Sequence, residues 1–121
     1  MLMRLFTGIW LIALATISLA PIKLKFELHT LGRMHYLGHW LIFLITAMLF
    51  CWGASGTVVK LRRCLGAVCL GILLEWLERV IYHNAYEWKD VLTDSAGVLA
   101  ALVLMLGVSL LGYSNGTDRT A

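Results

Sequence analysis

The sequence predicts an all-α fold, namely an integral membrane four-helix bundle with short loops that occupies residues 1–121 as a single transmembrane domain. Of the 121 residues, 60% are hydrophobic and 14% are charged, and the mean hydropathy is +0.83. A chain with so little polar surface cannot cover a water-soluble globule, and it is too apolar to remain disordered. Four apolar stretches of about 20 residues, the length that crosses a bilayer as a helix, complete the prediction.

The first apolar stretch, residues 5–22, has features of a secretory signal peptide as well as of a membrane span. Arg4 precedes it, and small residues at 18–20 offer a cleavage site. We expect the stretch to be retained, because the segment at 21–35 is too short to form a mature domain before the next helix. Since that segment alternates apolar and charged residues, we expect it to lie at the membrane interface.

The other three stretches lie at residues 36–56, 64–82 and 91–113. At about 1.5 Å per residue, each is near the length that crosses a hydrocarbon core of about 30 Å as a helix. Backbone N–H and C=O groups cannot stay unpaired in lipid, and none of these stretches alternates in the manner of a barrel strand. Helices are therefore predicted for all four spans.

The basic residues indicate an orientation. An even number of spans places both termini on one side of the membrane. Lysine and arginine divide equally between the two sides, but the loop predicted at residues 60–63 is the densest basic group close to two spans, which predicts that this loop and both termini are cytoplasmic. The net charge of +3 is scattered in such membrane-flanking groups, so no nucleic acid partner is expected.

The three cysteines agree with this orientation. Cys51 and Cys64 flank the basic loop on the reducing side of the membrane. Together with Cys69 they match neither the spacing of a zinc site nor a disulfide framework. We therefore expect all three to be buried apolar thiols.

Ionisable side chains gather on the opposite face of the membrane, where the second span starts, the third ends and the fourth starts. All of the seven acidic residues except Asp118 lie on that side. Glu75 lies eleven residues after Cys64, about 16 Å along the helix and hence inside the membrane. A carboxylate at that depth costs on the order of 2 kcal/mol or more, so it is expected to face the bundle interior and to mark a functional site.

Helical spacing aligns these groups into stripes, because side chains three or four residues apart share one face. His35 and His39 form such a pair on the second span, and similar stripes run along the third and fourth. The three stripes predict one outward-facing polar cavity. Its predicted binding residues are His39, Glu75, Glu78, Arg79, Asp90 and Asp94, with no catalytic residue assigned and no metal site predicted.

Several of these residues also have a purely structural role open to them. Glu75 and Arg79, four residues apart, can form an ion pair within one helix. Asp90 can complement the dipole at a helix start, and Asp94 can hydrogen-bond a neighbouring helix. The two histidines can be simple interfacial side chains, with metal ligation as a less favoured alternative. Convergence of all these groups on one face is what favours a site.

Three segments carry a family resemblance, with LGHWLIFL at residues 37–44, GILLEWLE at 71–78 and EWKDVLTDSAG at 87–97. In this order and spacing they resemble the VanZ-like membrane proteins of bacteria, over about residues 34–101. Glu78 stands where the family usually has glutamine, and Asp94 where asparagine is common, so both departures add acid. The positions that the resemblance carries over are His39, Glu75, Glu78, Asp90, Asp94 and Gly97.

The resemblance implies a small protein of the bacterial cytoplasmic (inner) membrane. The best-known members of the family confer low-level teicoplanin resistance, and their biochemical activity is poorly defined. On this basis the favoured function is binding of a lipid or glycan head group at the outward-facing acidic and histidine cavity. The cofactor, if there is one, is unknown.

Other functions stay open. A small metal-dependent membrane enzyme acting on phosphorylated lipid would use Glu75, Asp90 and Asp94 as ligands and His39 as acid or base. A transporter would need a homo-oligomer of such short chains, and a homo-oligomer is not excluded. A kinase like diacylglycerol kinase is disfavoured, because it would need its carboxylates on the cytoplasmic side.

Overall fold

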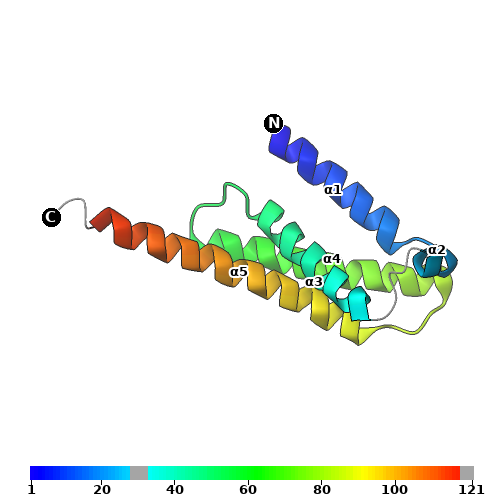
Figure 1. The fold of residues 1–121 in the computed structure, drawn as a ribbon. Helices are drawn as coiled ribbons and strands as arrows, with labels where there is room; N and C mark the ends of the chain where they lie inside the picture. Colours follow the sequence, from blue (N-terminus) through cyan, green and yellow to red (C-terminus); the bar gives the residue numbers. More distant parts are fainter. Residues whose placement is uncertain (28–32, 118–121) are drawn as a thin grey trace.

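The computed structural model describes residues 1–27 and 33–117, and within these ranges it contains helices and no strand (Figure 1). The prediction of an all-α fold is confirmed for this part of the chain. The helices are α1 (Leu2–Ser18), α2 (Ile22–Glu27), α3 (Arg33–Phe50), α4 (Thr57–Tyr82) and α5 (Trp88–Thr117).

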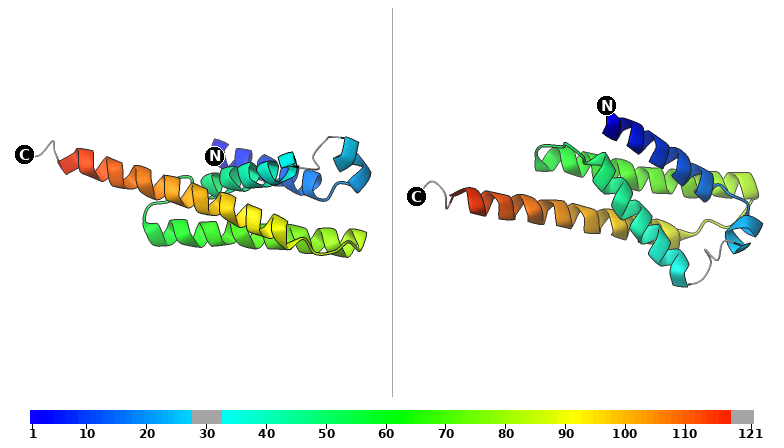
Figure 2. Two further views of the ribbon diagram at one scale, coloured as in Figure 1. Left: turned by 60° about the horizontal axis from the view of Figure 1, so that its bottom comes forward. Right: turned by 45° about the horizontal axis from the view of Figure 1, so that its top comes forward.

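The four long helices alternate in direction along the bundle (Figures 1 and 2). The α1–α2 and α4–α5 connections lie at one end, whereas the α3–α4 connection lies toward the other end, beyond which α5 projects. Helix α3 packs most extensively against α5, and α4 packs against both. Helix α1 makes fewer contacts and diverges from the others toward its N-terminus, so the predicted bundle is compact only in its α3–α5 part.

The turn between α3 and α4 comes earlier than predicted. Helix α3 ends at Phe50, rather than near residue 56, and the chain then reverses at Gly53 and Gly56. Both glycines have positive φ angles, 68° and 88°, which a residue with a Cβ rarely adopts. The guanidinium of Arg63 donates from Nη1 to the Phe50 carbonyl oxygen at 2.9 Å and so pairs one of the carbonyls left open at the end of α3.

Helix α4 correspondingly begins at Thr57, seven residues before the predicted start of the third span. Residues 60–63 therefore lie in the first turns of α4, and the prediction that they form a loop is wrong. Lysine, leucine and arginine are all good helix formers, and no glycine or proline interrupts them after Gly56. The basic group remains at the end of the bundle where the α3–α4 connection lies.

Small residues fill the interior of the bundle. Ala47 and Ala101 are fully buried, and Thr46 is the largest side chain without exposed surface among the described residues. Gly97 marks a close approach of α5 to α3, because a Cβ atom at this position would collide with the carbonyl oxygen of Trp40. Small residues of this kind let helix backbones approach closely.

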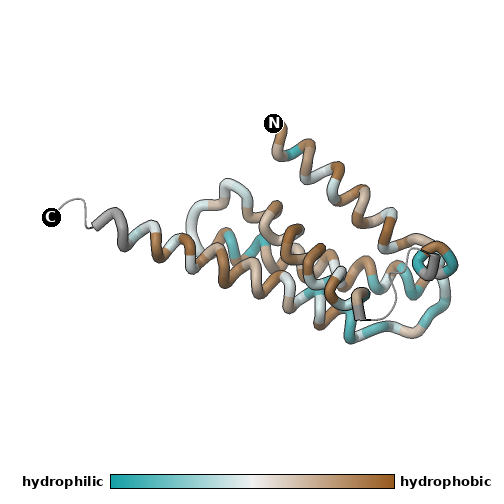
Figure 3. The backbone as a smooth tube through the Cα atoms, in the orientation of Figure 1, coloured by the Kyte–Doolittle hydropathy of each residue, from teal (hydrophilic) through white to brown (hydrophobic). Residues whose placement is uncertain are grey.

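Large apolar side chains cover the outside. On α5 alone, Leu92, Leu99, Val103, Leu110 and Leu111 are each at least 60% exposed. Hydrophilic residues gather instead at α2, at the α4–α5 connection and near the start of α4 (Figure 3). The bundle therefore carries its polar groups mainly at its two ends and its apolar groups along its length.

One helix of the described chain is long and apolar enough to cross a membrane by itself, over Trp88–Tyr113 of α5. Two further helical segments, Leu2–Ser18 and Met34–Phe50, are apolar but shorter. Only 17% of the most apolar window of α5 is buried, whereas the core helix of a water-soluble protein is buried over most of its surface. The described chain thus leaves most of the apolar surface of α5 uncovered.

Candidate functional site

A pocket of about 710 Å³ lies at the end of the bundle where α2 and the α4–α5 connection meet. Apolar side chains from α1 and α3, including Leu14, Ile17 and Ile42, form part of its lining. Polar groups from α3, α4 and α5 form another part. All six residues predicted to bind a ligand are among them, namely His39, Glu75, Glu78, Arg79, Asp90 and Asp94.

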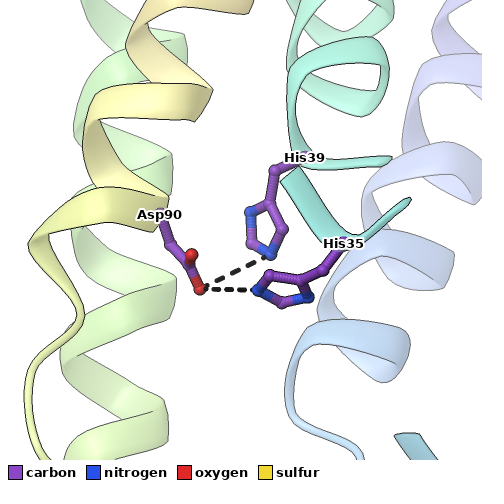
Figure 4. A group of neighbouring side chains, drawn as sticks. All are labelled: His35, His39 and Asp90. Atoms are coloured by element: carbon purple, nitrogen blue, oxygen red, sulfur yellow. Dashed lines mark hydrogen bonds and ion pairs between the residues drawn. The ribbon is translucent and has the colours of Figure 1, made fainter. Parts of the chain in front are cut away.

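Two histidines of α3 face one carboxylate of α5 (Figure 4). One helical turn separates His35 from His39, so both rings project from the same face of α3, with their centroids 4.5 Å apart. The Nε2 atom of His35 lies 3.1 Å from Oδ2 of Asp90, and the Nε2 atom of His39 lies 3.7 Å from the same oxygen. Asp90 occupies the first turn of α5, where a negative charge also complements the helix dipole.

His39 has a second acidic partner one turn further along α5. Its Nδ1 atom lies 2.7 Å from Oδ1 of Asp94, whose side chain is buried. Space for that carboxylate depends on Gly71 of α4, because a Cβ atom there would lie 3.1 Å from Oδ2 of Asp94 and 3.1 Å from the ring of Phe43. The carboxylate of Asp94 thus orients the imidazole of His39.

Glu75 is buried inside the bundle, as its depth in the third apolar stretch predicts. Its Oε1 atom accepts a hydrogen bond from the backbone N–H of Glu87 at 2.8 Å, which holds the α4–α5 connection against α4. No ion pair joins Glu75 to Arg79 among the described residues, so the helical ion pair considered from the sequence is not formed. The backbone donor takes its place, because the connection folds back over Glu75.

Glu78 and Arg79 lie nearer the rim. The carboxylate of Glu78 forms an ion pair with Lys25 of α2, with 2.7 Å between Oε1 and Nζ, and this contact ties α2 to α4. Arg79 is exposed and also lines the pocket. Glu78 therefore has a structural partner of its own, and Arg79 is the more accessible of the two to a ligand.

Asp90 carries an unusual buried atom. Asp90 is only 5% exposed, and its Oδ1 oxygen is buried without a hydrogen-bond partner among the described residues. The neighbouring Glu87 does not supply a donor when both carboxyl groups are ionised, because carboxylates only accept hydrogen bonds. Partial burial, then the charge of Asp90 and a side-chain hydrogen bond with it, raise the pKa of Glu87, which lies just before α5. Glu87 can donate to Asp90 only when it is protonated.

From the sequence, His35 is expected on the polar stripe but not among the binding residues, and no metal site is predicted. In the part of the chain that the structure describes, the group with suitable ligand atoms within 4.8 Å of one another consists of His35, His39 and Asp90. The enzyme alternative expects Glu75, Asp90 and Asp94 as the metal ligands, and these three do not form such a group among the described residues. The i, i+4 spacing of the two histidines was the signal that could have revealed this group.

In comparisons with known protein families, with curated proteins and with solved structures, nothing matches this chain.

Proposed function

We propose that this chain is a VanZ-like, multi-pass protein of the bacterial inner membrane, and that its pocket binds a lipid or glycan head group. The observation that carries the proposal is the distribution of polarity, with carboxylates and imidazoles inside one end of the bundle and large apolar side chains outside. Exposed apolar area on this scale is unfavourable in water and favourable in lipid. The buried acids are also of the kind that membrane helices turn toward the bundle interior.

Helix lengths agree with four crossings. The 17 residues of α1 and the 18 residues of α3 span about 25 to 27 Å, which is at the short end of the range for a membrane helix. The 26 residues of α4 and the 30 residues of α5 are longer than a perpendicular crossing requires, so these helices tilt or extend beyond the hydrocarbon. In the proposed orientation both termini are cytoplasmic and the pocket faces outward.

The lining of the pocket suits an amphiphilic ligand. Carboxylates such as Asp94 accept hydrogen bonds from hydroxyl or ammonium groups, and the guanidinium of Arg79 can pair with a phosphate. Leu14, Ile17 and Ile42 offer an apolar surface to the part of the ligand that follows the head group. A polar head on an apolar stem has this combination of groups, and a sugar shares its hydroxyl chemistry.

Binding titrations test the proposal. The chain, purified in detergent micelles, is titrated separately with short-chain phosphatidylethanolamine, short-chain phosphatidylglycerol and N-acetylglucosamine. We expect saturable 1:1 binding of at least one probe, which identifies the head group as lipid or glycan. Asp94→Ala should weaken it at least about tenfold by removing a buried acceptor. Lys60→Gln, a matched one-charge change at the other end of the bundle, should leave binding unchanged, and failure of all three probes to saturate would overturn the proposal.

The family resemblance extends the proposal to glycopeptide resistance. Expression of the chain in a teicoplanin-sensitive bacterium should raise the inhibitory concentration of teicoplanin, and Asp94→Ala should abolish the increase at equal protein level. If expression of the unsubstituted chain leaves teicoplanin susceptibility unchanged, the proposed role in resistance is wrong. Head-group binding is then judged by the titrations alone.

A further inference from the structure

We infer that His35, His39 and Asp90 form a binding site for one divalent transition-metal ion of the Zn²⁺ class. The inference goes beyond head-group binding, because it concerns an ion held by the protein itself. It starts from one ligand atom of each residue, two from α3 and one from α5, and these three atoms lie within 4.8 Å of one another. Two imidazoles and a carboxylate are ligands that such ions bind readily.

The spacing of these atoms is that of ligands around a common ion. Imidazole nitrogens and carboxylate oxygens bind Zn²⁺ at about 2.0–2.2 Å, so two ligands in tetrahedral geometry are about 3.4 Å apart. The separations from Asp90 Oδ2 are 3.1 Å to His35 Nε2 and 3.7 Å to His39 Nε2. Small side-chain movements suffice to place one ion among the three.

The tautomer of His39 is fixed by its second partner. Nδ1 of His39 lies 2.7 Å from a carboxylate oxygen of Asp94, and an ionised carboxylate only accepts hydrogen bonds, so Nδ1 then carries the hydrogen and Nε2 can keep a lone pair that faces Asp90. A carboxylate behind a ligating histidine orients the ring and raises the basicity of the ligand. Asp94 is therefore a positioning residue for this site.

The orphaned oxygen of Asp90 points to a missing partner. A buried carboxylate oxygen without a donor or cation is costly, and Oδ1 of Asp90 is such an atom among the described residues. A metal ion bound by this carboxylate would compensate the charge of both oxygens, either by bidentate ligation or through a bound water. Complementing the helix dipole of α5 explains the presence of an acid here, but it leaves Oδ1 unpaired. The neighbouring group that could donate to Asp90 in place of a metal is Glu87, and only in its protonated form.

An ion also resolves the approach of two histidines to a single oxygen. If both Nε2 atoms donated hydrogen bonds to Asp90 while Nδ1 of His39 donated to Asp94, His39 would be a cation beside a second donor ring, with centroids 4.5 Å apart. One divalent ion binds two neutral rings at the same place. Since all three residues line the pocket, a coordination position remains for water or for an oxygen of a pocket ligand.

The test is a metal titration of the untagged full chain, purified in detergent micelles, stripped with a chelator and titrated with ZnCl₂ alone. We expect one Zn²⁺ per chain by elemental analysis after desalting, with a Zn²⁺-dependent rise in Tm. His35→Gln and the nearly isosteric Asp90→Asn should each weaken binding at least about 100-fold. Asp94→Asn, which keeps an acceptor for Nδ1–H, should weaken it by about 10-fold and alter the visible spectrum of bound Co²⁺.

His83→Asn is the matched control, because it removes an imidazole outside the site. His83 is in the left-handed conformation at the end of α4, which asparagine tolerates, so this variant should bind Zn²⁺ like the wild type. Variants are compared only when circular dichroism shows unchanged helix content. Absence of stoichiometric Zn²⁺ binding by the folded wild type, or binding that survives both His35→Gln and Asp90→Asn, would overturn the inference. No head-group probe is present, so either proposal can fail without the other.

Discussion

The Nδ1 atom of His39 lies 2.7 Å from the Oδ1 atom of Asp94, and this contact joins α3 to α5 inside the bundle. It lies near Gly97, where the backbones of the two helices approach each other closely. A hydrogen bond in so enclosed a place is strengthened by the low local dielectric, and either partner left alone there is costly. The same pair can therefore orient a ligating imidazole and stabilise the fold.

The two functions of Asp94 can be separated by substitution. Asp94→Ala leaves the partly buried N–H of His39 without an acceptor, and we expect it to lower the free energy of unfolding by about 1–3 kcal/mol. Asp94→Asn keeps an acceptor oxygen and should cost clearly less. Thermal unfolding of metal-free protein in detergent, followed by circular dichroism, measures the stability of both variants. Equal losses of stability in Asp94→Ala and Asp94→Asn would show that the hydrogen bond to His39 is unimportant.

Gly97 should be the most sensitive glycine of α5. Gly97→Ala places a methyl group against the Trp40 carbonyl, a backbone atom that cannot rotate away, so α3 and α5 must separate. We expect the free energy of unfolding to fall by about 1–3 kcal/mol and the melting temperature to fall with it. Gly107→Ala on the same helix meets open space and should be neutral or stabilising by up to about 1 kcal/mol. Equal melting temperatures for the two variants would contradict the close packing.

Glu87 should make stability depend on pH. Its pKa is raised above the ordinary value of 4.5, first by partial desolvation and then by Asp90. Between the ordinary and the raised value the folded chain binds more protons than the unfolded chain, so the stabilising contribution is lost as pH rises through this window. In metal-free protein, Glu87→Gln should therefore have a higher melting temperature than the wild type near neutral pH. Its melting temperature should also change less than that of the wild type as the pH is lowered. Parallel melting curves across this range would contradict the assignment.

Topology can be tested at the two connections. Ser55 and Asn84 are exposed and lie in the α3–α4 and α4–α5 connections, toward opposite ends of the bundle. An impermeant maleimide added to intact cells should label Asn84→Cys and spare Ser55→Cys, which becomes reactive after the cells are permeabilised. The reverse pattern would place the pocket in the cytoplasm, and labelling of both from outside would exclude a membrane between them.

Helical periodicity predicted several of the polar side chains that share the pocket. His39, Glu75, Asp90 and Asp94 each fall on the face of their helix that also carries the neighbouring polar residues, and a buried acid must turn toward the interior whatever the details of packing. The long apolar stretches likewise predicted the four long helices. The predicted ends of the helices were less accurate. A run of charged residues at 60–63 predicts a loop between two spans, but these residue types also favour helix, and α4 includes them.

Partners of the polar groups could not be predicted in the same way. Periodicity suggested Arg79, one turn away, as the partner of Glu75, whereas the structure uses the backbone N–H of Glu87. That choice depends on how the α4–α5 connection folds back, which no spacing within a helix encodes. The ion pair between Lys25 and Glu78 joins residues 53 positions apart and depends on the placement of α2, a helix that the alternating sequence did not indicate.

Accessibility of Cys69 tests the membrane-spanning bundle most directly. Cys51 and Cys64 are buried, whereas Cys69 is exposed near the middle of α4, so the prediction that all three cysteines are buried is wrong for Cys69. Membrane vesicles made permeable to a water-soluble maleimide are labelled, and the modified residues are identified by mass spectrometry, with Asn84→Cys as the positive control. If lipid surrounds α4, Cys69 should stay unmodified until the protein is denatured in detergent. Rapid labelling of Cys69 in the folded, membrane-associated chain would contradict the account, because the exposed apolar surface would then face water.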